Sequence, residues 1–131
     1  MTVYVIQVQL FNDDGKYETL FKCGYTKNID DRVKGVVKEL NAAGYTEARA
    51  RLWMCLLDAG TTLESSLLDE TEEYQKLVEK RFPGTYFMEY RTYDAIDRIW
   101  YWFNDEMEEA WGTDAWADRF YKPAGTPSWV S

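Results

Sequence analysis

Histidine is absent from this 131-residue chain, and cysteine occurs only twice. The lack of histidine removes the most common general base and the most common ligand of transition metals. Cys23 and Cys55 both lie inside apolar runs. Because a free cysteine is usually buried, we expect two small buried thiols; a disulfide is the alternative, and an intracellular location disfavours it.

Long hydrophobic runs are also missing, since no apolar stretch approaches the roughly 20 residues that span a bilayer. The first residues lack a basic region leading into an apolar segment, so we expect no secretory signal, no membrane partner and a cytoplasmic location. The length suits one domain with one core. We expect that domain over residues 1–122 and a loose C-terminal tail over residues 123–131, although Trp129 could pack back.

Basic residues are in the minority, with 15 Lys and Arg against 23 Asp and Glu and a net charge of −8. This balance is unfavourable for binding nucleic acid, because phosphate contacts draw on clustered Lys and Arg. The first forty residues are neutral, however, with six basic residues against six acidic ones, and the excess acid lies downstream. The asymmetry is compatible with an N-terminal half that faces phosphate, and equally with an acidic C-terminal surface that binds a basic protein.

Hydrophobic periodicity predicts a hairpin, a helix and a strand in the first half. Residues 3–10 and 17–25 alternate with period two, and the intervening Asn-Asp-Asp-Gly supplies turn chemistry, so the two runs predict an antiparallel hairpin. Asn28 is placed to cap a helix whose apolar positions recur at helical spacing up to Leu40, with Gly44 as its stop. The near-continuous apolar run from Ala50 to Leu57 predicts a central strand buried on both faces.

The second half is dominated by helical spacing. Ser66 and Asp69 resemble a capping pair for a helix that ends at Phe82. A short strand is expected over residues 85–90, and Thr92 is placed to cap a long helix whose apolar stripe continues to Trp111. The expected fold class is therefore α+β, with a small three-stranded mixed sheet in a β-β-α-β-α core, helices packed on it, and an additional long C-terminal helix.

One stretch carries a motif. Residues 21–32 read Phe-Lys-Cys-Gly-Tyr-Thr-Lys-Asn-Ile-Asp-Asp-Arg, in which a strand ends at a glycine, a capped helix begins, and an arginine follows eight residues later. The stretch resembles the second half of the GIY-YIG nuclease signature, and Tyr4 stands where such a domain carries its first motif. The lysine form of the second motif, Lys22-Cys23-Gly24 here, occurs in phage-type relatives. The resemblance implies a nuclease scaffold over roughly the first ninety residues.

The resemblance also implies roles for individual residues. It assigns catalysis to Tyr4, Lys22 and Arg32. It assigns substrate binding to Gly24, which matches the glycine of the second motif, and to Thr26 and Asn28, which match the polar positions that follow. A glutamate on a later helix is expected to hold one divalent metal, Mg²⁺. At the expected position stands Gln75, so the metal ligand is predicted to be Glu79, one turn along the same helix face, with Glu64 as the alternative.

Several departures from the signature support a second interpretation. Thr2 replaces a glycine of the first motif, Lys22 replaces a tyrosine, and Gln75 is a weak ligand for Mg²⁺. The chain is then a catalytically degenerate acidic protein, of phage accessory or counter-defence type, that binds or inhibits a basic protein partner. Tryptophans are favoured interface anchors, and the candidates are Trp100, Trp111 and Trp116. An unrelated α/β binding module is the third interpretation.

Overall fold

The structure is a computed structural model that describes residues 1–11, 15–57, 59, 61–82, 87–106, 120–121 and 129–131. The strands are β1 (Thr2–Phe11), β2 (Tyr17–Thr26), β3 (Arg49–Leu56), β4 (Tyr90–Thr92) and β5 (Phe120–Tyr121). The helices are α1 (Ile29–Ala42), α2 (Thr61–Glu70), α3 (Glu72–Arg81) and α4 (Ile96–Tyr101). A 3-10 turn at Tyr93–Ala95 precedes α4, and a π-helical turn at Trp102–Glu106 follows it.

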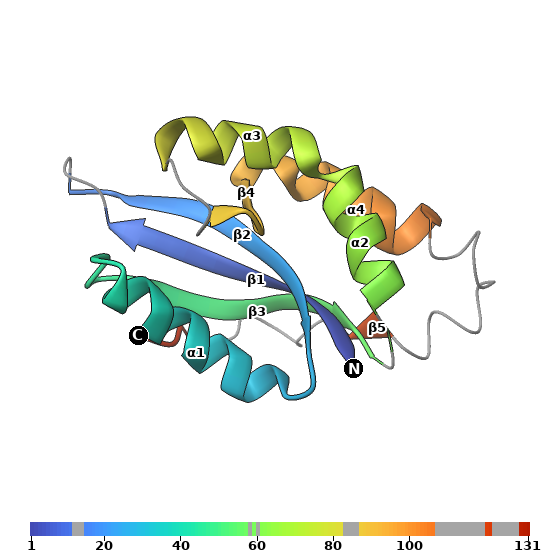
Figure 1. Ribbon diagram of the computed structural model, residues 1–131, viewed down its shortest axis with the longest axis horizontal. Helices are drawn as coiled ribbons and strands as arrows, with labels where there is room; N and C mark the ends of the chain where they lie inside the picture. The colour runs from blue at the N-terminus through green and yellow to red at the C-terminus, as the bar shows by residue number, and fades with distance from the viewer. Residues whose placement is uncertain (12–14, 58, 60, 83–86, 107–119, 122–128) are drawn as a thin grey trace.

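The five strands form one antiparallel sheet in the order β4-β2-β1-β3-β5 (Figure 1). The α+β class and the β-β-α-β-α beginning are confirmed, but the predicted three-stranded mixed sheet is wrong. α1 returns the chain to the hairpin end of the sheet, so β3 runs parallel to β2. Because β3 pairs with β1 and not with β2, every pairing is antiparallel. The two additional strands span three and two residues, too short for a period-two pattern.

The helices of the second half are shorter than predicted. The single helix expected from Ser66 to Phe82 is divided into α2 and α3 at Thr71, a buried residue whose hydroxyl donates to the carbonyl of Leu67 at 2.9 Å. Thr92 ends β4 and stands at the N-cap position of the 3-10 turn that leads into α4, but its side chain makes no capping hydrogen bond, and α4 itself begins only at Ile96. The predicted continuation of that helix through Trp111 lies outside the described residues. The strand expected over residues 85–90 is found instead at Tyr90–Thr92, where β2 supplies its partner.

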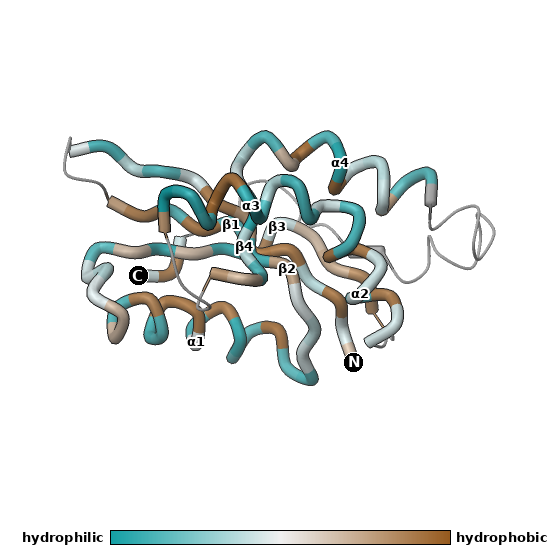
Figure 2. Tube along the Cα trace, turned by 45° about the horizontal axis from the view of Figure 1, so that its top comes forward, coloured by the Kyte–Doolittle hydropathy of each residue, from teal (hydrophilic) through white to brown (hydrophobic). Residues whose placement is uncertain are grey.

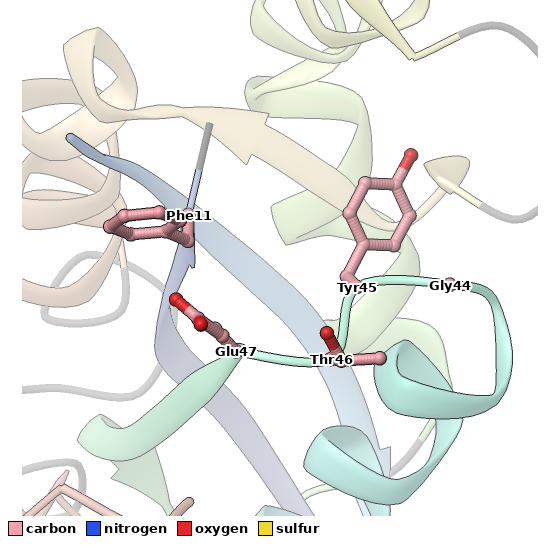
Figure 3. Close-up of a pocket in the computed structure, with 5 residues that line it drawn as sticks. All are labelled: Phe11, Gly44, Tyr45, Thr46 and Glu47. Atoms are coloured by element: carbon pink, nitrogen blue, oxygen red, sulfur yellow. The ribbon is translucent and has the colours of Figure 1, made fainter. Parts of the chain in front are cut away.

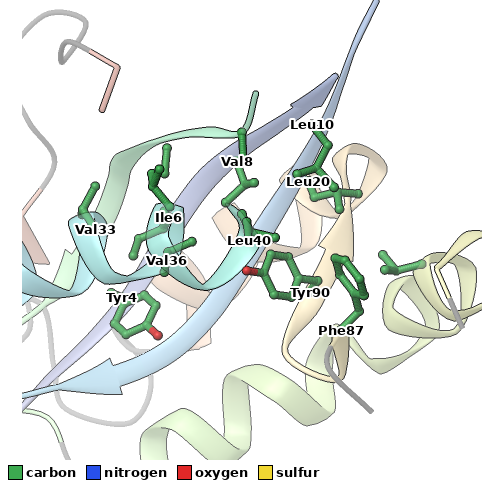
Figure 4. Close-up of a cluster of buried hydrophobic side chains, with 14 of the residues drawn as sticks. Tyr4, Ile6, Val8, Leu10, Leu20, Val33, Val36, Leu40, Phe87 and Tyr90 are labelled. Carbon is green, nitrogen blue, oxygen red and sulfur yellow. The ribbon is translucent and has the colours of Figure 1, made fainter. Parts of the chain in front are cut away.

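Two hydrophobic clusters cover the two faces of the sheet. On one face, α1 packs its buried positions Val33, Val36, Val37 and Leu40 against alternate residues of β1 (Figure 4). On the other face, α2 and α4 pack against Val3, Val5 and Phe21. Figure 2 shows the hydropathy pattern behind this arrangement, with hydrophobic segments along the strands and alternating polar and hydrophobic positions along α1.

The two cysteines lie in different clusters. Cys23 belongs to the cluster under α2 and α4, and Cys55 to the cluster under α1. Both are free and buried, which confirms the expectation of two buried thiols. Burial raises the pKa of each thiol to about 11. Both groups therefore stay protonated at neutral pH and behave as small apolar side chains.

Among the helices that the structure describes, none is long and apolar enough to cross a membrane. Residues 123–128 of the predicted loose tail lie outside the described residues, whereas Val130 near its end pairs with the sheet. The N–H and carbonyl of Val130 exchange hydrogen bonds with Ala50 of β3, at 2.8 and 2.9 Å.

Candidate functional site

The contact at the centre of the candidate site joins β1 to the start of α1. Arg32 donates its Nε–H to the hydroxyl of Tyr4 at 3.1 Å, across 28 residues of sequence. The helix start that places Arg32 is set by Asn28, whose side chain accepts a hydrogen bond from the backbone N–H of Asp31 at 3.2 Å. Tyr4 is only 1% exposed and lies at one end of the cluster beneath α1 (Figure 4). Tyr4 and Arg32 therefore share one face of the sheet.

Gly24 faces Tyr4 directly across the hairpin. A Cβ atom at this position would lie 2.6 Å from the Tyr4 hydroxyl oxygen, 2.8 Å from Cζ of the same ring and 3.0 Å from a carboxylate oxygen of Glu89. Contacts this short exclude any side chain without displacement of the ring. The glycine of the motif thus provides the space in which the tyrosine lies against the β2 backbone.

Lys22 lies on the same face as Tyr4, two residues before Gly24 on β2. Its Nζ donates to Glu89 at 2.9 Å, with the lysine side chain 6% exposed and the glutamate side chain 45% exposed. Glu89 immediately precedes β4 and is held beside β2 by a backbone hydrogen bond from Cys23 to its carbonyl, at 3.0 Å. The residue was not predicted from the sequence, because its position depends on the pairing of β4 with β2.

A second carboxylate approaches from the first turn of α2. Partial burial raises the pKa of Glu64, repulsion from Glu89 raises it further, and the charge of Lys22 and a hydrogen bond from the backbone of Tyr25 oppose this shift. Glu64 therefore lies within electrostatic range of the Lys22–Glu89 pair. Glu79 is exposed on α3, and it joins none of the described contacts among these groups. The metal-binding role predicted for Glu79 stays a prediction.

Arg32 also carries an acidic partner. Its two terminal nitrogens contact the carboxylate of Glu39, which lies two helical turns farther along α1, at 2.8 and 3.5 Å. Partial burial acts to lower the pKa of Arg32, but hydrogen bonds to Glu39 and to Tyr4 raise it above its ordinary value. Arg32 is therefore a permanent cation held in a fixed orientation, with its side chain still 27% exposed.

The site combines a fixed hydroxyl, two cations and three carboxylates, which are those of Glu39, Glu64 and Glu89. Within the described part of the chain, no group of three or more His, Cys, Asp or Glu side chains is arranged to hold a metal ion. Two carboxylates nevertheless fit Mg²⁺, which is commonly bound through one or two carboxylates and completes its shell with water and substrate phosphate. Glu64 and Glu89 are the pair whose mutual repulsion such a cation would relieve.

The remaining predicted site residues have local or core contacts. The hydroxyl of Thr26 and the backbone of Asn28 exchange hydrogen bonds at 3.3 Å, which closes the turn into α1. Their predicted contact with substrate stays a prediction. Trp100 is partly buried and packs against the cluster under α2 and α4. Trp111 and Trp116 lie outside the described residues.

Comparison with models of protein families, with curated proteins and with solved structures finds no match to this chain.

Proposed function

We propose that the protein cleaves phosphodiester bonds of nucleic acid in a metal-dependent reaction at the Tyr4–Arg32 site. The observation that carries this proposal is the hydrogen bond between Arg32 and the Tyr4 hydroxyl, made over a glycine that has no room for a side chain. These are the residues that match the GIY-YIG signature, and they converge although they come from two strands and a helix.

Each group has a defined part in the proposed reaction. Arg32 stabilises the negative charge that develops on the phosphate, because its guanidinium is fixed in advance by Tyr4. Tyr4 positions the attacking water, and Lys22 adds a second cation two residues from Gly24. Glu64 and Glu89 would hold the Mg²⁺ ion, which when bound supplies Lewis-acid charge to the phosphate oxygens.

The test is a cleavage assay on plasmid and single-stranded DNA with Mg²⁺ and with a chelator. Cleavage is expected only with metal, and Arg32→Ala should lower the rate by roughly 10²–10³, as for other preorganised charge-stabilising groups. Arg98→Ala serves as the matched control, since Arg98 pairs with Glu70 on α2 and contacts none of the site residues described above. Cleavage that persists with chelator, or in Arg32→Ala, would rule the proposal out.

The metal ligand is tested in the same assay with two isosteric variants. Glu64→Gln is expected to abolish the metal response, and Glu79→Gln, with the same charge change on exposed α3, should leave it intact. Loss of the metal response in Glu79→Gln but not in Glu64→Gln would identify Glu79 as the metal ligand.

A specific observation also supports the alternative, a catalytically degenerate acidic protein that binds a basic protein. Both cations of the site already have carboxylate partners, Lys22 with Glu89 and Arg32 with Glu39. Under this interpretation the site is neutralised from within and cuts nothing. Absence of cleavage with Mg²⁺ or Mn²⁺, together with salt-sensitive binding to one member of a panel of basic proteins, would favour it.

A further inference from the structure

The sheet face opposite the candidate site changes from apolar to polar side chains along its length. Near the start of β1, Val3 and Val5 are covered by the cluster that includes α2 and α4. Farther along the same face come Gln7 and Gln9. Directly across from them on β3 stand Arg51, opposite Gln7, and Arg49, opposite Gln9.

The two arginines have neutral hydrogen-bond partners. Arg49 donates through Nε and Nη2 to the side-chain oxygen of Gln9, at 2.8 and 2.5 Å, and Arg51 donates through Nε to that of Gln7, at 2.7 Å. Neither takes part in an ion pair with any described residue. Desolvation and the charge of Arg49 lower the pKa of Arg51. In a chain with 23 acidic residues, two adjacent guanidiniums that have no carboxylate partner among the described residues suit an anionic ligand.

Aromatic rings hold the guanidiniums in place. The guanidinium carbon of Arg49 lies 4.3 Å from the ring centre of Tyr17 and 4.5 Å from that of Trp129. That of Arg51 lies 4.0 Å from the Trp129 ring centre. Trp129 is fixed because its neighbour Val130 pairs with Ala50. Cation–π contacts restrict the arginines while their remaining N–H groups stay available.

Two hollows open at this end of the sheet. One, of about 240 Å³, is lined by Tyr17, Arg49 and Trp129 together with Asn41, Thr46, Glu47, Ala48 and Ser131. The other, of about 330 Å³, is lined by Phe11, Gly44, Tyr45, Thr46 and Glu47 (Figure 3). Thr46 and Glu47 line both, so the two hollows are neighbours. The rings of Phe11 and Tyr17 meet edge to face, and each is more than 40% exposed.

We propose that these neighbouring hollows bind a nucleotide, with the base beside Phe11 and Tyr17. The phosphate would lie on Arg49, which lines the smaller hollow, and on the adjacent Arg51, whose guanidinium shares the Trp129 ring with Arg49. Paired guanidiniums suit phosphate oxygens, and exposed aromatic rings next to them provide stacking surface for a base. Glu47 offers an acceptor to a sugar hydroxyl or a base amine. The bound phosphate belongs either to a free mononucleotide or to the phosphorylated end of a nucleic-acid strand. The hollows are separate from the Tyr4–Arg32 site, which lies on the other face of the sheet.

The test is calorimetric titration of the full chain with adenosine 5′-monophosphate, adenosine, inorganic phosphate and short oligodeoxyadenylates with and without a 5′-phosphate. The monophosphate is expected to bind more tightly than adenosine or phosphate alone. Arg51→Gln should weaken it by about tenfold or more, the value of one charge-assisted hydrogen bond. Arg98→Gln carries the same charge change on α4 and should leave the affinity unchanged.

The same titrations distinguish a free mononucleotide from the phosphorylated end of a strand. Tighter binding of the 5′-phosphorylated oligonucleotide than of the monophosphate identifies a strand end, and the reverse identifies a free nucleotide. If Arg51→Gln fails to fold, Arg51→Lys and the backbone amide shifts of residues 46–51 in the wild-type chain localise binding instead. Absence of binding, equal affinity for adenosine, an unaffected Arg51 variant, or shifts confined to residues around Arg32 would each overturn the proposal.

Discussion

At the scale of single residues, the packing of Tyr4 against Gly24 decides where the tyrosine hydroxyl points. The ring fills the space that a side chain at position 24 would occupy, and Arg32 closes over it. Position 24 therefore tolerates no side chain, because the Tyr4 ring already fills the space.

Gly24→Ala is expected to destabilise the fold by about 1–3 kcal/mol, because overpacking forces the Tyr4 ring away from β2. The measurement is urea unfolding. Gly35→Ala in α1 is the matched control: an added Cβ there meets only Nη1 of Arg32 at an ordinary 3.8 Å, so this variant should be neutral or stabilise by up to about 1 kcal/mol. Equal effects of the two substitutions would contradict the packing described at Gly24.

Glu39 controls the charge that Arg32 presents. Glu39→Gln removes the carboxylate that contacts both terminal nitrogens of Arg32, so affinity for single-stranded DNA should rise at low salt. Stability should change by less than about 1 kcal/mol, because the pair is partly exposed. Fluorescence anisotropy with a labelled oligonucleotide measures the effect, and Glu70→Gln, which breaks the Arg98 pair, is the control. An increase of the same size in both variants would mean that only net charge matters.

At the scale of elements, a buried arginine joins the α2–α3 junction to the edge strand β4. Arg91 is 2% exposed and donates to the Thr71 hydroxyl at 2.8 Å, to the carbonyls of Met88 and Tyr90 at 2.8 and 3.0 Å, and to that of Leu68 at 3.2 Å. Its cation lies at the C-terminal end of α2, where the helix dipole favours positive charge. Arg91 gives a reason for the division of the single predicted helix into α2 and α3. The break at Thr71 leaves the Thr71 hydroxyl and the Leu68 carbonyl as acceptors for Arg91.

Arg91→Met should destabilise the protein by at least about 1–3 kcal/mol, since it keeps the volume but leaves buried acceptors without donors. Arg98→Met, on half-exposed α4, should change stability by no more than about 0.5 kcal/mol. Thermal and urea unfolding of both variants provide the comparison. Because β4 also carries the segment that contains Glu89, the Arg91 variant should lose the Lys22–Glu89 contact as well. An Arg91→Met protein as stable as the wild type would refute this role.

At the scale of the whole molecule, the net charge of −8 opposes the two cationic regions. The Arg32 site and the Arg49–Arg51 pair lie on opposite faces of the sheet, and the helices that follow β3 carry most of the acid in the described second half. Phosphate binding is therefore local, and the long-range field favours a basic partner.

Binding of duplex DNA is expected to be weak at physiological salt, because the net charge of −8 repels phosphates over a Debye length of about 8 Å. A salt titration against duplex DNA, single-stranded DNA and basic proteins tests this expectation. Basic proteins should bind more tightly as salt falls, with an increased association rate. Submicromolar binding to duplex DNA with a steep negative salt slope would contradict it.

The sequence by itself determined the hairpin, the start of α1 and the convergence of Tyr4, Gly24 and Arg32. Each depends on a local signal: alternation along β1 and β2, the Asn28 cap, and the spacing from Gly24 to Arg32. Short-range signals of this kind set the backbone conformation within a few residues, so they can be interpreted without knowing the rest of the fold.

Only the tertiary structure decided the outer strands, the break at Thr71 and the carboxylates beside Lys22. β4 exists because Leu20 to Lys22 pair with it, and Glu89 reaches Lys22 only through that pairing. Glu64 comes within electrostatic range of them because α2 begins soon after β3. Contacts between residues as many as 67 positions apart leave no periodicity in the chain, since their energy comes from packing and pairing that form only in the folded state.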